Sequence, residues 1–152
     1  FGNKREILLY LLETIMTGHR EQVQRAIKDA GPDHWARLNA LIDIHLAVGA
    51  ETDPSITAAW IGIGAEALRD DEVRKPYNQA LSELASWFSG VIKEGNEDGV
   101  FFFDNLNVAT GALVSMIQGY FSIAVTSRSL IPRGSAALAA RSMARGLLSP
   151  QS

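Results

Sequence analysis

The sequence contains no cysteine among its 152 residues. Disulfide bonds, cysteine nucleophiles and thiolate-bound metal sites are therefore excluded, and we expect a reducing, cytoplasmic environment. Charge of one sign is not in large excess either, because 14 Lys and Arg residues stand against 17 Asp and Glu residues, for a net charge of −3. A chain with this balance is not expected to bind nucleic acid by bulk electrostatic attraction.

Long hydrophobic runs are also scarce. The longest stretch without a charged residue, 105–127, has a length that would suit a membrane span. Polar side chains within it make it too polar for a lipid core, so we expect no membrane association. These polar residues are Asn107, Thr110, Ser115, Gln118 and Ser122. The first residues lack the cleavage site of a signal peptide, and because the chain begins at Phe1 rather than Met we expect further residues upstream.

Apolar residues recur every three or four positions along most of the chain, which is the spacing of helices with one buried face. Breaks are marked by Gly31-Pro32, by Asp53-Pro54 and by the acidic segment 69–72. The sequence therefore predicts an all-α fold with no sheet. The six predicted helices are 4–29, 33–49, 54–68, a fourth whose acidic first turn lies within the segment 69–72 and which ends near 93, 105–127 and 135–148.

Finer expectations concern the ends of these helices. Pro32 should occupy the first turn of the second helix, since proline is favoured there. Asp53 and Asp104 should cap the third and fifth helices. Pro76 should kink the first turns of the fourth helix or delay its start. We expect a loop at 95–103.

The uncharged helix 105–127 has two distinct faces at helical pitch. Large apolar residues fall on one face, and a stripe of small residues falls on the other. A helix that is apolar all round must be buried on all sides. We therefore expect one face to pack on the domain core and the small-residue face to pack on a second subunit. The first face carries Leu113, Met116, Ile117, Tyr120 and Ala124, and the second carries Gly111, Ser115, Gly119 and Ser122.

Signals for catalysis or cofactor binding are weak. The segment 62–67 matches a dinucleotide-binding glycine pattern, but it lies within a predicted helix with no strand before it. His34 and His45 lie about 16 Å apart along one helix and cannot share a metal. We interpret His19 and His45 as core histidines, with a polar contact inside a ligand cavity as the alternative for His45. We predict no catalytic residue, no metal and no cofactor.

Several segments together resemble one protein family. The first residues read FGNKREIL, and the segment 60–74 reads WIGIGAEALRDDEVR. The former resembles the end of the DNA-binding domain of TetR-family transcriptional regulators, with Phe1, Lys4 and Leu8 at its phenylalanine, lysine and leucine positions. The latter resembles the W-x-x-F-x-A-E-A-L-R-D-P-E-L-R segment of the choline-regulator, or BetI-like, branch, from which Ile63 and Asp71 depart.

Two shorter segments, 92–95 and 117–120, resemble the I-x-E-G and I-D-G-L segments of the same branch. Gln118 stands where that branch has an acidic residue. The resemblance covers the whole chain in helix order. It implies an antiparallel six-helix TetR-like regulatory domain in 4–152, preceded in 1–3 by a remnant of the helix-turn-helix domain.

The resemblance also implies a function. The chain would be the effector-binding and dimerisation part of a bacterial transcriptional regulator, expected to be a repressor and not an enzyme. Its last two helices would pair with those of a second subunit as a four-helix bundle, which agrees with the two faces of 105–127. Operator DNA would be bound through the missing N-terminal domain, with Lys4 near a DNA phosphate. A ligand would favour one spacing of the two DNA-binding domains, according to its differential affinity for the two states.

The predicted effector is a small apolar or cationic molecule, since the candidate wall is aromatic and uncharged. The predicted pocket residues are Leu41, His45, Trp60, Gly64, Trp87, Met116 and Tyr120. The predicted interface residues are Gly111, Ser115, Gly119, Ser122, Ala140, Met143 and Leu147. If the small-residue stripe lines the cavity instead, the two sets partly exchange. Two other classes remain open, namely a freestanding helical carrier of an apolar molecule and a small all-helical enzyme.

Overall fold

The computed structural model describes residues 2–46, 54–127 and 129–151, and these form six α-helices with no strand among them. The all-α prediction is confirmed. The helices are α1 (Lys4–Asp29), α2 (His34–Leu46), α3 (Pro54–Ala67), α4 (Asp71–Glu97), α5 (Leu106–Thr126) and α6 (Ser135–Leu148).

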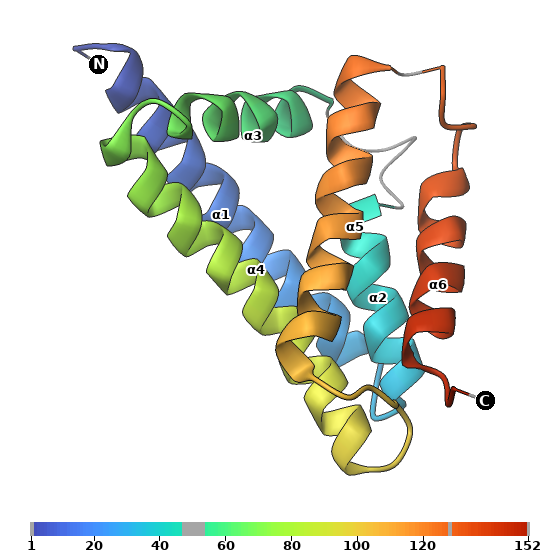
Figure 1. The fold of residues 1–152 in the computed structure, drawn as a ribbon. Helices are drawn as coiled ribbons and strands as arrows, with labels where there is room; N and C mark the ends of the chain where they lie inside the picture. Colours follow the sequence, from blue (N-terminus) through green and yellow to red (C-terminus); the bar gives the residue numbers. More distant parts are fainter. Residues whose placement is uncertain (1, 47–53, 128, 152) are drawn as a thin grey trace.

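The helices form two groups (Figure 1). The long helices α1 and α4 run side by side, while α2, α5 and α6 stand together on the other side of the molecule. Helix α3 lies across one end, between the α1–α4 pair and α5. The buried side chains form two clusters: one lies mainly among α2, α4, α5 and α6, and the other lies among α1, α3 and α4. Trp87 and Phe121 pack against both clusters and so mark the seam between them.

Side-chain caps fix the starts of several helices. The side chains of Asn3, Asp33, Asp70 and Asn105 each accept a hydrogen bond from a backbone N–H two or three residues later. Two predictions were wrong here. Asn105 rather than Asp104 caps α5, because the helix begins at Leu106. Asp33 is the residue that precedes α2, so Pro32 lies outside the first turn.

Helix α4 has the predicted acidic first turn, formed by Asp71 and Glu72, but differs from its prediction at its C-terminal end. It begins at Asp71 and continues through Pro76, so the proline does not delay its start. It also runs to Glu97, about one turn beyond the predicted end near 93. Gly95 lies in this extra turn, buried under the ring of Phe101, and its carbonyl accepts hydrogen bonds from the amides of Val100 and Phe101. The predicted end of the second helix at 47–49 and the predicted cap Asp53 lie outside the described residues.

Helix α5 turns Leu113 and Ile117 into the core and leaves its small-residue stripe exposed. Within the described part of the chain it is the one helix long and apolar enough to cross a membrane, by length and composition alone. It packs against α2, α3, α4 and α6. Its Gln118 side chain accepts a hydrogen bond from the indole of Trp60. These contacts are those of a core helix with one face left uncovered.

Candidate functional site

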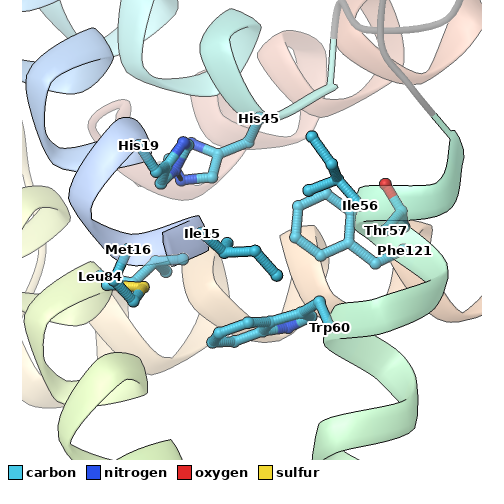
Figure 2. Close-up of a pocket in the computed structure, with 9 residues that line it drawn as sticks. All are labelled: Ile15, Met16, His19, His45, Ile56, Thr57, Trp60, Leu84 and Phe121. Atoms are coloured by element: carbon cyan, nitrogen blue, oxygen red, sulfur yellow. Dashed lines mark hydrogen bonds between the residues drawn. The ribbon is translucent and has the colours of Figure 1, made fainter. Parts of the chain in front are cut away.

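A cavity of about 80 Å³ lies at the seam between the two clusters, where side chains from α1 to α5 meet (Figure 2). Typical ligand pockets hold roughly 300–1,000 Å³, so all but the smallest molecules require the helices to move apart. The lining carries no Asp, Glu, Lys or Arg side chain among the described residues. It consists of Ile15, Met16, His19, His45, Ile56, Thr57, Trp60, Leu84 and Phe121.

Two histidines from different helices, together with Thr57, form the polar part of this wall (Figure 2). The Nε2 atoms of His19 on α1 and His45 on α2 lie 2.8 Å apart, within hydrogen-bond distance. The Nδ1 atom of His45 lies 2.7 Å from the carbonyl oxygen of Leu41. Since a carbonyl only accepts, Nδ1 of His45 carries the proton and donates it. In the neutral ring Nε2 of His45 must then accept, so Nε2–H of His19 is the donor between the two rings.

Burial keeps both rings neutral. His45 is 4% exposed, and burial, with the neighbouring His19, lowers its pKa to about 3. Burial also lowers the pKa of His19, against a smaller opposing effect of Glu83. The carboxylate of Glu83 is itself paired with Arg20, whose guanidinium lowers the pKa of Glu83. The cavity therefore presents an uncharged hydrogen-bonded pair in an apolar wall.

Aromatic side chains hold the two histidines in place. The ring of His45 lies 5.7 Å from that of Phe88 and 6.5 Å from that of Phe121, measured between centroids. The ring of His19 lies 5.6 Å from that of Trp87 in an edge-to-face arrangement. These contacts fix the ring orientations on which the hydrogen bond between the histidines depends.

Trp60 forms the opposite wall and is also fixed (Figure 2). Its indole N–H donates to the side-chain oxygen of Gln118 over 2.8 Å, and its ring lies 4.8 Å from that of Tyr77. Its donor is therefore already occupied, and Trp60 offers the cavity apolar surface. Ile56, which is 46% exposed, lines the outer part of the cavity.

The predicted pocket residues lie at different distances from this cavity. His45 and Trp60 line it. Leu41 is fully buried and contributes the carbonyl that orients His45. Trp87 packs on His19 and so stands directly behind the wall, whereas Gly64 lies against Tyr77, which itself packs behind Trp60. Met116 and Tyr120 are half-buried against the cluster of α2, α4, α5 and α6.

Sequence reasoning missed most of the wall. Ile15 and His19 lie on the apolar stripe of α1, and Met16 is adjacent to Ile15. Ile56 and Thr57 lie at the start of α3, and Leu84 and Phe121 come from α4 and α5. A helical pattern identifies the buried face of each helix, but it does not say which buried faces leave space between them. The apolar stripes of α1, α3 and α4 do contain Ile15, Ile56 and Leu84, and the stripe of α1 also places His19 among apolar residues.

The predicted interface residues differ in how far they are exposed. Gly111, Ser115, Gly119 and Ser122 of α5 are exposed, and so is Met143 of α6, while Leu147 is half-buried. Ala140 is fully buried within the chain, so its side chain is not available to a second subunit and its assignment is corrected. Two large apolar residues of these helices that the prediction omitted are also exposed, Val108 of α5 at 71% and Leu138 of α6 at 69%.

The segment 60–74 joins the cavity to the N-terminal end of α1. Lys4 pairs with Glu66, and Arg5 pairs with both Asp70 and Glu72. The turn itself is closed by Arg74, which donates to the carbonyls of Ala67, the last residue of α3, and of Leu68. The charged residues of this segment thus bind the start of α1, while Trp60 lines the cavity. Lys4, predicted near a DNA phosphate, is engaged by a carboxylate of its own chain.

Comparisons with known proteins bear on the fold. No protein-family model matches the chain, and no curated protein matches it either. Among solved structures, the chain is similar to a TetR transcription regulator from Haloarcula marismortui ATCC 43049, with a TM-score of 0.77 and 23% sequence identity. The alignment covers 98% of this chain and 81% of that one. The likeness shows a TetR-like all-helical fold, which confirms the fold class predicted from the sequence.

Proposed function

We propose that this chain is the effector-binding and dimerisation part of a TetR-type transcriptional regulator, acting as a repressor in the cytoplasm. Within that class we propose the BetI-like branch, on the strength of the segment 60–74. The observation that carries the proposal is the apolar cavity of a TetR-like fold whose wall includes α1, the helix that would carry the DNA-binding domain.

The position of α1 supports a route from cavity to DNA. Ile15 and His19 of α1 line the cavity, and the N-terminal end of that helix, bound to the α3–α4 turn by Lys4 and Arg5, lies about 16 Å away from Ile15. A ligand that separates α1 from α2 or α3 would tilt α1 as a rigid element. Tilting α1 in both subunits would change the spacing of two DNA-binding domains attached at its start. The ligand acts through its differential affinity for the two spacings.

The outer surface of α5 and α6 supports a dimer. An exposed stripe of Gly111, Ser115 and Gly119 allows a second backbone to approach closely, and Val108, three residues before Gly111, adds exposed apolar surface to the same face of α5. Apolar surface of this kind on a domain marks an interaction site. We propose that a second copy covers it, so that α5 and α6 of two subunits form a four-helix bundle with Met143 and Leu147 at its edge.

The cavity lining favours a neutral effector over a cationic one. A cation would have to lose its hydration, and no carboxylate lines the described wall to compensate it. Glu83 is the acidic residue that acts on the pKa of His19, and its carboxylate is already paired with Arg20. We therefore propose a small, predominantly apolar, uncharged molecule.

Native mass spectrometry of the purified chain tests the dimer. We expect twice the denatured mass at micromolar concentration, and any excess mass would identify a bound molecule. A monomer at that concentration would contradict the proposed interface.

The DNA-binding part of the proposal is tested on the gene. We expect codons for a basic helix-turn-helix in frame before Phe1, and a product that binds its own upstream DNA in a mobility-shift assay. A gene without that segment, together with a cavity that binds apolar molecules, would instead favour the freestanding carrier.

A further inference from the structure

The hydrogen bond between His19 and His45 has a fixed direction. Because Nδ1 of His45 donates to the carbonyl of Leu41, Nε2 of His45 is an acceptor and Nε2–H of His19 is the donor. The two atoms face each other in the cavity wall, one on α1 and the other on α2. A ligand group that enters between them therefore meets one donor and one acceptor.

Few chemical groups satisfy both partners. A hydroxyl accepts from His19 through its oxygen and donates its proton to Nε2 of His45, so neither ring loses a hydrogen bond. A carbonyl or an ether accepts from His19 but leaves the buried Nε2 of His45 without a donor, which is costly. A hydrocarbon satisfies neither ring and can only lie beside the pair.

The rest of the wall selects an apolar body for that ligand. The indole N–H of Trp60 is already bound to Gln118, and the hydroxyl of Thr57 lies near Ile56, away from the two imidazoles (Figure 2). The remaining lining is aliphatic, aromatic or thioether. We propose that the cavity takes a neutral apolar alcohol or phenol whose hydroxyl enters between Nε2 of His19 and Nε2 of His45. This inference rests on the proposed function, in which the cavity is the effector site.

Entry of the hydroxyl would also move the helices. Two hydrogen bonds of normal length meeting at one oxygen place the two Nε2 atoms about 4.6 Å apart, against 2.8 Å in the present pair. The carbonyl of Leu41 and the rings of Phe88 and Phe121 hold His45, so the displacement falls mainly on His19 and α1. The same hydroxyl that provides specificity would thus displace the helix that leads to the DNA-binding domain.

Binding of phenol, anisole and toluene to the whole chain, measured by calorimetry near neutral pH, tests the inference. The three probes share one ring and differ in whether they donate and accept, accept only, or do neither. We expect phenol to bind about tenfold more tightly than the other two, the equivalent of one good hydrogen bond. In His45→Phe, which keeps an aromatic ring beside Phe88 but removes the acceptor, phenol and anisole can both accept from His19, so the preference for phenol over anisole should fall to about twofold or less.

A second measurement needs no variant. Imidazole ¹⁵N chemical shifts of the unmodified chain report which ring nitrogens carry protons, and phenol should shift Nε2 of both histidines while leaving Nδ1 of His45 protonated. Toluene binding as tightly as phenol would overturn the hydroxyl preference but leave the apolar effector site intact. Failure of all three probes to bind would overturn the inference, while the dimer and DNA measurements decide the proposed function independently.

Discussion

Acidification is expected to destabilise the folded chain through His45. The pKa of this histidine is about 3 in the folded protein, against an ordinary value of about 6.5 in the unfolded chain. Between these values the unfolded state binds a proton that the folded state does not. The stability that neutral His45 contributes to the folded chain is therefore complete above about pH 6.5, and it is lost as the pH falls from there toward the folded pKa of about 3.

The size of this loss follows from the two pKa values. Each pH unit within the window costs about 1.4 kcal/mol for one group, so lowering the pH from about 7.5 to about 5 removes roughly 2 kcal/mol. For a domain of this length that corresponds to a fall of roughly 4–8 °C in Tm. His19, whose pKa is also lowered by burial, adds to the loss in the same direction.

Urea unfolding at a series of pH values, compared between the unmodified chain and His45→Gln, measures the effect. The free energy of unfolding of the variant should fall less between pH 7.5 and pH 5 than that of the unmodified chain, and the difference should equal the amount assigned to His45. This comparison holds whatever the stability of the variant itself. Asp70 and Glu83, whose pKa values are lowered by Arg5 and Arg20, destabilise the fold only below about pH 4 and do so equally in both proteins. Equal slopes between pH 7.5 and pH 5 would refute a neutral buried His45.

Three further predictions concern packing and assembly. In chemical denaturation, Gly95→Ala should lower the free energy of unfolding by about 2–4 kcal/mol, because a Cβ there would lie 2.2 Å from the buried ring of Phe101. Gly90→Ala is the control: no atom lies near its Cβ, so it should raise the free energy of unfolding by up to about 1 kcal/mol. Gly119→Leu should convert the proposed dimer to a monomer in sedimentation equilibrium. Gly90→Leu, at a position that is also exposed and helical, should leave the mass unchanged. Dissociation of both variants would argue against the α5 interface. Trp60→Phe should lower the free energy of unfolding by about 1–2 kcal/mol, because it removes the hydrogen-bond donor to Gln118. Adding Gln118→Leu should recover part of that loss. If the effects of the two substitutions simply add, the hydrogen bond contributes nothing.

Helix positions were largely predictable from the sequence because the relevant forces are local. The stripe of apolar residues and the proline and glycine breaks placed all six helices, and α6 matches its predicted bounds, Ser135–Leu148. The errors at the starts of α2 and α5 are shifts of about one residue, whereas the error at the end of α4 arose from a contact outside the helix. The extra turn of α4 depends on Phe101 covering Gly95, a contact that the spacing of residues within the helix does not indicate.

The cavity could be predicted only in part. His45 and Trp60 were identified because each is a polar or aromatic residue on a buried stripe. The pairing of His45 with His19, 26 positions earlier in the chain, depends on how α1 and α2 are rotated against each other. Ala140 shows the same difficulty at the surface, since α6 is rich in small residues on two sides and its packing against α2 and α5 decides which side is covered.

The three tryptophans give the molecule separate optical probes. Trp60 lines the cavity, Trp87 contacts His19 at the seam between the clusters, and Trp35 lies beneath the guanidinium of Arg145 near the far end of α6. In a chain labelled with 5-fluorotryptophan, each indole would give its own ¹⁹F resonance. Ligand entry, histidine protonation and rearrangement at the end of α6 would then be followed at the same time in one spectrum, without an added dye.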